Sequence, residues 1–398
     1  VYLDALGAQR IPDPTTEGDF CRRFTAHDVE ILQDTLNEVR LGVWRQQPKE
    51  FFKLAILDAD GVVAETYGEC KQGIGRAYNG VWGYHPLVVS LANTQEPLYL
   101  ANRSGNRPSN EGAAGYLDRA IALCRRAGFK RVLLRGDTDF SQTEHLDRWH
   151  LDGVQFLFGL DARANLVELA ENLPESAWKT LQRPPKYEVS TKPRQRPTNV
   201  KEEIVVANGY RNIKLQGEAV ACFAYKPYAC KRQYTVVALR KDLAVEHGQC
   251  RFFEDVRYFF YLTNLPAGDP AELVYLANDR CNQENLLEQL RNGVRALNMP
   301  VDGLVSNWAY MVMASVAWSL KAWFALRLPE RGRWKEKHRQ QKRQVLTMEF
   351  KRFVNSFVRV PCQIVRAGRR IVYRLLAWNP WQAVFARGLV ALGCPLRC

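Results

Sequence analysis

The sequence predicts an α/β protein whose core is a mixed sheet flanked by helices. Three short apolar runs, at residues 53–60, 87–91 and 96–101, are bounded by polar residues and are typical of strands. A helical pattern follows at 110–128, and another strand pattern comes directly after it at 130–135. Strands, a helix and a further strand in this order make an α/β unit.

The first 50 residues are predicted to be helical. Thr25 and Asp28 have the spacing of a capping box, and the periodic apolar run that follows ends before Pro48. The helix at 110–128 is predicted to have Asn110 as its N-cap and Gly128 as its C′ residue. Its apolar face is expected to contain Ala113, Leu117, Ile121 and Leu123.

Residues 160–255 are predicted to form a β-rich insertion. Three runs there alternate or are apolar, at 203–206, 220–225 and 233–239, a fourth follows directly at 258–262, and a surface segment rich in Pro, Lys and Arg precedes them at 184–197. We divide the chain into a helical N-terminal segment (1–50), an α/β core (51–159 and 256–328), the insertion (160–255) and a basic helical C-terminal region (329–398).

The region after the insertion is predicted to be helical. Asp269-Pro270 is a good N-cap with Pro at the first helical position. The stretch from Trp308 to Leu328 is the only membrane candidate, but its uncharged run ends at Lys321, short of the roughly 20 residues that a span needs. We therefore expect a buried core helix and no membrane association.

The charge balance favours an anionic partner. The chain has 398 residues with 56 Lys and Arg against 42 Asp and Glu, a net charge of +14. Nucleic acid is the commonest partner of such a protein, although an unrelated basic enzyme would look similar. The ten cysteines include no CxxC pair, and no His lies at ligand spacing from them, which argues against zinc and disulfides. Reduced cysteines and the lack of an opening secretory signal predict a cytoplasmic protein.

Two strand ends carry the first candidate catalytic residues. Asp60, with Asp58 two residues earlier, ends the strand at 53–60, and Asp137 follows the strand at 130–135. Carboxylates at neighbouring strand ends can hold Mg²⁺, and two such ions stabilise both oxygens in phosphodiester cleavage. The alternative is that they are polar strand ends facing solvent.

Glu284 is the third candidate. Arg280, Glu284 and Arg291 are spaced by four and then seven residues, which keeps them on one face of an α-helix. The opposite face carries Leu286, Leu287 and Leu290. The helix could therefore present a metal-binding Glu between two cations that meet phosphates, or only an exposed Arg–Glu pair.

Basic clusters are candidate DNA-contact surfaces. The densest contains Arg331, Arg333, Lys335, Lys337, Arg339, Lys342 and Arg343. Two others contain Lys192, Arg194 and Arg196, and a predicted helical stripe of Arg366, Arg369, Arg370 and Arg374. Each could instead be a solvated basic face. Trp178 and Trp334 could stack on unpaired bases, or belong to the core or its rim.

The motifs in their order resemble the DDE transposases of bacterial insertion sequences, in particular the thirteen-eighty insertion-sequence family. The similar segments are Pro12–Phe24, Leu57–Asp60, Tyr78–Gly80, Tyr84–Leu87, Arg103–Asn106, Arg135–Phe140 and Arg280–Asn285.

The resemblance implies an RNase H-like catalytic fold with a β insertion between the second Asp and the Glu. It implies that Asp60, Asp137 and Glu284 are the catalytic triad and hold two Mg²⁺ ions, for which Mn²⁺ can substitute. Arg280, Glu284 and Arg291 would match the Tyr-Arg-Glu-Lys signature. It further implies cleavage and strand transfer at transposon ends on double-stranded DNA, a homodimer in a synaptic complex, and association with the bacterial nucleoid. Residues 1–50 would be a truncated DNA-binding region.

Some positions depart from the family pattern. Gly61 and Val62 follow Asp60 where the family has Thr or Ser at the second position, so Asp58 remains an alternative first ligand. Asp139 stands in place of a usual Gly. Tyr275 lies five rather than three residues before Arg280, and Arg291 replaces a Lys. Two other functions stay open: a catalytically inactive or domesticated DNA-binding protein, and a glycosyltransferase that uses Asp58-Ala-Asp60 as a metal-binding DxD motif.

Overall fold

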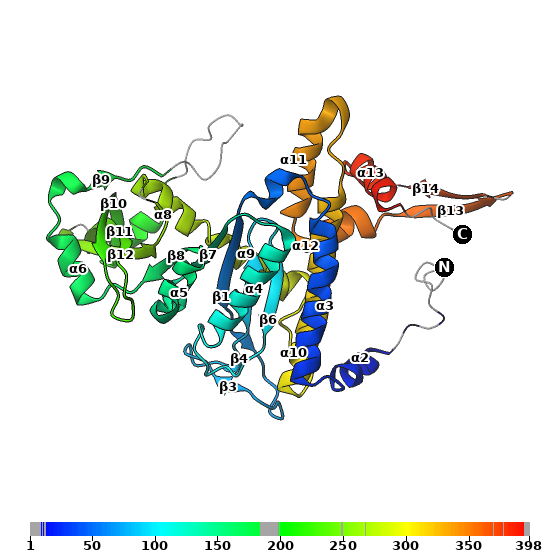
Figure 1. Cartoon of the computed structure of the whole chain (residues 1–398), viewed down its shortest axis with the longest axis horizontal. Helices are drawn as coiled ribbons and strands as arrows, with labels where there is room; N and C mark the ends of the chain where they lie inside the picture. Colours follow the sequence, from blue (N-terminus) through cyan, green and yellow to red (C-terminus); the bar gives the residue numbers. More distant parts are fainter. Residues whose placement is uncertain are drawn as a thin grey trace. The chain divides into compact units, whose positions relative to one another are not determined.

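The computed structural model describes residues 9, 11, 13–183, 198, 200–247, 250–266, 268–368, 370–376 and 378–393 (Figure 1). The chain divides into two compact units. Unit 1 comprises Val1–Leu134 and Arg280–Cys398, and unit 2 comprises Arg135–Asp279. The predicted α/β class, with flanking helices and a mainly helical C-terminal region, is confirmed.

A sheet in the order β6-β5-β1-β7 lies in unit 1, and β7 continues to the first residues of unit 2. The strands are β1 (Ala55–Gly61), β5 (Leu87–Leu91), β6 (Glu96–Ala101) and β7 (Val132–Gly136). β1 pairs antiparallel with β5, which places Ser90 opposite Asp58 and Val88 opposite Asp60. The predicted strands at 87–91 and 96–101 are thus found at those residues. A small sheet of β2 (Ala64–Glu65), β4 (Trp82–Tyr84) and β3 (Gly75–Arg76) follows β1.

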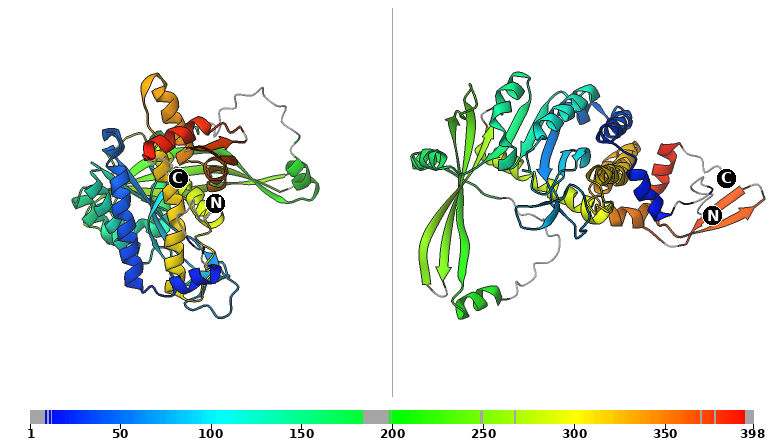
Figure 2. Two further views of the ribbon diagram at one scale, coloured as in Figure 1. Left: turned by 90° about the vertical axis from the view of Figure 1, so that its right-hand side faces the viewer. Right: turned by 90° about the horizontal axis from the view of Figure 1, so that it is seen from below.

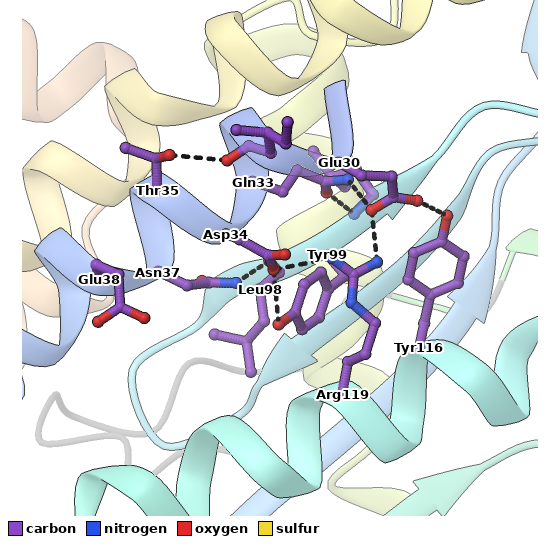
Figure 3. A network of polar contacts seen from close by, with 12 residues as sticks. Glu30, Gln33, Asp34, Thr35, Asn37, Glu38, Leu98, Tyr99, Tyr116 and Arg119 are labelled. Carbon is purple, nitrogen blue, oxygen red and sulfur yellow. Dashed lines mark hydrogen bonds and ion pairs between the residues drawn. The ribbon is translucent and has the colours of Figure 1, made fainter. Parts of the chain in front are cut away.

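Helices α3 (Ala26–Trp44) and α4 (Ala113–Ala127) cover this sheet, with α2 (Pro14–Cys21) before them and the 3-10 turn η1 (Lys49–Lys53) after α3. The capping box of Thr25 and Asp28 is present, as predicted. A polar network joins α3 to α4: Arg119 pairs with Glu30 and Asp34, and the Tyr116 hydroxyl donates to Glu30 at 2.6 Å (Figure 3). Because the predicted apolar residues of α4 are buried, the network fixes a helix that already packs on the core.

A buried carboxylate ties α10 (Leu304–Arg327) to this layer. Glu96 on β6 is fully buried and pairs with Arg40 of α3 at 3.0 Å. Its two oxygens also accept hydrogen bonds from the indoles of Trp44 at 3.0 Å and Trp323 at 2.7 Å. A buried charge is tolerated when it is paired and fully hydrogen-bonded, which is the case here.

α10 is the only described helix long and apolar enough to cross a membrane, and 61% of its most apolar window is buried within the protein. That burial fits the predicted core helix. Lys321, in the C-terminal third of α10, is fully buried and lies over the ring of Trp318. Its ammonium donates to the carbonyl oxygens of Leu346 at 2.7 Å and Met348 at 2.9 Å. Burial lowers the pKa of Lys321 to about 7.

The C-terminal helices pack around α10 with an apolar core that includes Ala325, Val345, Phe357 and Val384. The elements are η6 (Gly332–Trp334), α11 (Lys335–Leu346), α12 (Phe350–Phe353), the π-helical η7 (Val354–Val358) and α13 (Gln382–Leu392). Between η7 and α13 the chain forms a separate two-stranded hairpin of β13 (Cys362–Ala367) and β14 (Arg370–Leu375).

Unit 2 contains a sheet in the order β8-β12-β11-β10-β9. Its strands are β8 (Gln155–Leu160), β9 (Lys179–Thr180) and the long antiparallel strands β10 (Arg211–Tyr225), β11 (Tyr234–His247) and β12 (Cys250–Thr263). Its helices are η2 (Thr138–Ser141), η3 (Thr143–His145), α5 (Leu146–Leu151), α6 (Ala164–Glu171), η4 (Glu175–Ala177), α7 (Val200–Ala207) and α8 (Pro270–Asn278). α8 begins at the predicted Asp269 cap and packs on β10 and β11 through Leu273 and Val274.

Three local predictions were wrong. The run at 203–206 lies in α7, because four residues are too few to separate strand from helix periodicity. α4 has Gly112 at φ 72° as its N-cap in place of the predicted Asn110, whose backbone oxygen accepts a hydrogen bond from Ala113 in the turn before the helix. The arginines at 366, 370 and 374 lie on β13 and β14 rather than on a helix, since the β-branched residues beside them favour strands and Gly368, at φ 61°, makes the turn. Arg369, and the cluster of Lys192, Arg194 and Arg196, lie outside the described residues.

Candidate active site

Asp60 lies near the end of β1, where the strand leaves the sheet. Its side chain is 14% exposed, whereas Asp58, two residues earlier on the same face of the strand, is 1% exposed. The next residue must be small: a Cβ on Gly61 would lie 2.8 Å from Nε2 of His85. His85 is itself fixed, because its Nδ1 lies 2.8 Å from the Arg107 carbonyl oxygen. His85 therefore helps to order the loop after β1.

Arg280 connects Asp60 to the helix of Glu284. Its guanidinium lies 3.0 Å from Oδ2 of Asp60, and both side chains are mostly buried. Arg280 is the residue at which α9 (Cys281–Glu288) begins. The pair thus joins the start of α9 to the end of β1 across 220 residues of sequence.

Gln283 makes a second tie between α9 and the sheet. It is 2% exposed, its Oε1 accepts a short hydrogen bond from the Ser90 hydroxyl, and its Nε2 donates to the Val88 carbonyl oxygen at 3.4 Å. Ser90 and Val88 are the residues of β5 opposite Asp58 and Asp60. Gln283 therefore fixes α9 on the strand that pairs with both acidic residues.

Sequence reasoning missed Gln283, although a signal was present. Residues 283, 286, 287 and 290 have the spacing of one helix face, and the predicted Leu286, Leu287 and Leu290 are all buried. Gln283 is the one polar residue of that buried stripe. A buried amide needs hydrogen-bond partners, so its position predicts a specific contact.

Glu284 is exposed in the first turn of α9, on the other side from this stripe. An acidic side chain is favourable near a helix N-terminus. Arg291 lies beyond α9 in the π-helical turn η5 (Gln289–Gly293), so the predicted uninterrupted α-helix through Arg291 was wrong. Arg291 nevertheless reaches the segment after β1, because its guanidinium donates to the Val63 carbonyl oxygen at 2.7 Å.

Asp137 directly follows β7 and belongs to unit 2. Its side chain is partly buried, and its Oδ1 accepts a hydrogen bond from the backbone N–H of Asp139 at 3.1 Å, which caps η2. The glycine before it is required, since a Cβ on Gly136 would lie 2.5 Å from Cβ of Phe140. The carboxylate is thus held at a strand end, as the sequence predicted.

Carboxylate oxygens are the right donors for Mg²⁺. Within the described residues, however, no three His, Cys, Asp or Glu side chains form a group that could hold a metal ion. Asp60 and Glu284 belong to unit 1 and Asp137 to unit 2. The donor chemistry fits a metal, and the joint geometry of the three residues stays a prediction.

The basic block at 331–343 divides into exposed and internally paired side chains. Arg339 and Lys342 both pair with Glu330, at 3.2 and 3.4 Å. The side chains that remain exposed are Arg331, Arg333, Lys335, Lys337 and Arg343. Trp334 is 54% exposed and lies between Arg333 and Lys337, whereas Trp178 packs with Arg240 and Tyr258 in unit 2.

The sequence matches the family Transposase DDE domain group 1 over residues 15–393, nearly its whole length. The chain belongs to this transposase family. The family assignment supports the predicted DDE transposase and gives no support to the glycosyltransferase alternative. The DDE family generally uses divalent metal ions.

No curated protein matches the sequence. Among solved structures, a cryo-EM structure of the piggyBac transposase synaptic complex with hairpin DNA is similar, at 11% identity and a TM-score of 0.34. The match covers 77% of this chain and 55% of that one, so this chain spans about half the length of that transposase.

Proposed function

We propose that the chain binds the terminal repeats of a transposon and catalyses metal-dependent cleavage and strand transfer of DNA. Cleavage would add water across a phosphodiester bond and release a 3′-OH. That hydroxyl would then attack a second phosphodiester, on the opposite strand or on target DNA, with an alkoxide of the attacked strand leaving. The main support within the fold is the pairing of Asp60 with Arg280, which begins the helix that carries Glu284.

Asp60, Asp137 and Glu284 would hold the divalent ions, with Mg²⁺ as the natural metal and Mn²⁺ as a substitute. When bound, such ions stabilise the attacking and leaving oxygens of the phosphate. We favour Asp60 over Asp58 as the first ligand, because Asp58 is almost completely buried on the sheet.

The arginines of this region would act on the DNA backbone. Without DNA, Arg280 neutralises Asp60, and its planar guanidinium could also donate two hydrogen bonds to a phosphate. Arg291, anchored at Val63, would add positive charge on the same segment. Arg331, Arg333, Lys335, Lys337 and Arg343 would bind backbone phosphates farther along the duplex, with Arg339 and Lys342 holding the block in place. Synapsis of two transposon ends would require a homodimer, acting on DNA of the bacterial nucleoid.

Nicking of a labelled duplex tests this function. The substrate is the inverted repeat that flanks the coding region, incubated with Mg²⁺, with Mn²⁺ or with a chelator. We expect metal-dependent nicking by the wild type and a loss of about 1,000-fold in Asp137→Ala, because a metal ligand supplies several kcal/mol of transition-state stabilisation. Asp139→Ala is the matched control, since it removes an exposed acid two residues away.

Two results would contradict the proposal. Wild type that binds the duplex but nicks it no faster than Asp137→Ala would indicate the alternative, an inactive or domesticated DNA-binding protein. Equal loss of activity in Asp139→Ala would show that the effect is not specific to the predicted ligand.

A further inference from the structure

The positive charge of the chain is concentrated at one end. Residues 331–398 contain 16 of the 56 basic residues and 2 of the 42 acidic ones. The preceding 330 residues therefore contain 40 of each and have no net charge. No Asp or Glu follows Glu349 in the sequence. Since long-range attraction to DNA depends on net charge, this end of the chain should dominate it.

The β13–β14 hairpin lies within this basic segment and forms a two-stranded sheet that no other described strand joins. Figures 1 and 2 both show it extending away from the helices of unit 1. Most of its described side chains are exposed, including Ile364 at 43% and Tyr373 at 39%. A two-stranded hairpin alone is marginally stable in water, so this one is expected to gain stability from a partner.

Both faces of the hairpin combine arginine with apolar side chains. The register places Ile364 opposite Tyr373, and Arg366 shares their face of the ribbon. On the other face Gln363 lies opposite Arg374, with Val372 two residues away. The described residues provide no acidic partner for Arg366 or Arg374.

The basic and aromatic surface continues at the base of the hairpin. A hollow there is lined by Lys351, Arg352, Trp378 and Trp381, together with Glu349. Trp378 is 81% exposed, and the guanidinium of Arg352 lies 6.0 Å from the ring centre of Trp381. Cations and exposed aromatic rings together are typical of surfaces that contact nucleic acid.

We propose that the β13–β14 hairpin is a DNA-binding arm that enters the major groove of the duplex. The major groove is about 12 Å wide and admits a two-stranded ribbon. Six residues per strand span about 20 Å, so the ribbon is long enough to follow the groove. Arginine can contact guanine or the phosphates, and apolar side chains can contact the thymine methyl group. The identity of this DNA as transposon or target rests on the proposed function.

Charge argues against a second copy of the chain as the occupant. Two hairpins brought together would both present arginines, with no acidic residue on either to balance them. Duplex DNA is the complementary partner, because it carries one negative charge for every 1.7 Å or so of its axis.

Salt-dependent binding by the full chain tests the arm. The DNA affinities of wild type and of Arg366→Gln/Arg374→Gln are compared by fluorescence anisotropy, with a metal chelator present, on a random-sequence duplex of about 40 base pairs. Loss of two phosphate or base contacts should lower the slope of log Kd against log salt by about 2 and weaken binding roughly 10- to 100-fold. Arg125→Gln/Arg126→Gln on α4 is the matched control and should bind as wild type. An unchanged slope in a folded hairpin variant would overturn the proposal.

Hydrogen exchange gives a second measurement that needs no variant. Amides of β13 and β14 should exchange quickly in the protein alone and slowly once duplex is added. Protection that grows with protein concentration without DNA would overturn the arm in favour of contact between copies.

Failure of the arm and failure of the proposed function are distinguishable. If wild type nicks DNA and the hairpin variant binds DNA as tightly as wild type, the arm is rejected and the proposed function stands. A reduced slope in a protein that never nicks DNA would support the arm and reject catalysis.

Discussion

Arg280 and Arg366 are both cations of unit 1, but they differ in burial and in pairing. Arg280 is mostly buried, starts α9 and is bonded to Asp60 at 3.0 Å. Arg366 is exposed on the hairpin, in a segment of 49 residues without an acid. Paired charges fix geometry, whereas exposed cations contribute attraction that salt can screen. We therefore expect the α9 region to determine how fast bound DNA is nicked, and the hairpin to determine how tightly DNA binds.

The largest effect that tests this comparison is expected when Arg280 is replaced. Arg280→Met leaves the mostly buried Asp60 without its cationic partner and removes the ion pair between the start of α9 and β1. We expect nicking at saturating DNA to fall about 100-fold, the loss usual for a group that orients a metal ligand, with a much smaller loss of DNA affinity from its one phosphate contact. Arg280→Lys should recover only part of the rate, because an ammonium lacks the planar geometry. Quench-flow nicking and anisotropy would check this; a large loss of affinity with a normal rate would contradict it.

A smaller effect on the same side is expected at Gln283. Gln283→Leu keeps the volume and apolar packing of the stripe but removes both hydrogen bonds to β5. We expect nicking to fall about 10-fold and the Mg²⁺ concentration needed for half-maximal rate to rise, because Glu284 lies next to the lost contact.

Gln283→Glu should also reduce nicking, since a carboxylate cannot donate a hydrogen bond to the Val88 carbonyl oxygen. Glu288→Gln, one turn beyond Glu284 and exposed, is the control. A loss of thermal stability without any shift in the metal dependence would show that Gln283 is only structural.

The smallest effect concerns Lys321, whose amino group donates to two carbonyl oxygens and has no acidic partner among the described residues. Its folded pKa of about 7 lies below the usual value, so between pH 7 and 10 the unfolded chain binds a proton that the folded chain does not. Stability should therefore rise with pH, by roughly 1 kcal/mol per unit. Lys321→Met should remove that rise, as measured by urea unfolding at pH 7, 8 and 9. Parallel pH profiles for the two proteins would contradict this.

The sequence predicted the parts of the site that depend on local patterns. The strands at 87–91 and 96–101, the Thr25 cap and the buried face of α9 follow from apolar spacing and capping residues. The contacts of Arg280 and Gln283 could not be predicted, since their partners lie about 200 residues away and only the fold brings them together. The arginines of the hairpin were misread because Arg366, Arg370 and Arg374 are four residues apart, which fits one face of a helix when Gly368 is not recognised as a turn.

The π-helical turn at Gln289–Gly293 has a consequence for variation in this protein. A wide turn arises when one residue more than the α-helix needs is accommodated in the backbone. Deleting a single residue there, ahead of Arg291, would restore the narrower α-helical pitch and move Arg291 by about 100° around the helix axis. Arg291 would swing away from Val63 with no change in its identity. A one-residue deletion at this turn would therefore change what Arg291 contacts while Arg280, Glu284 and Arg291 all remain in the sequence.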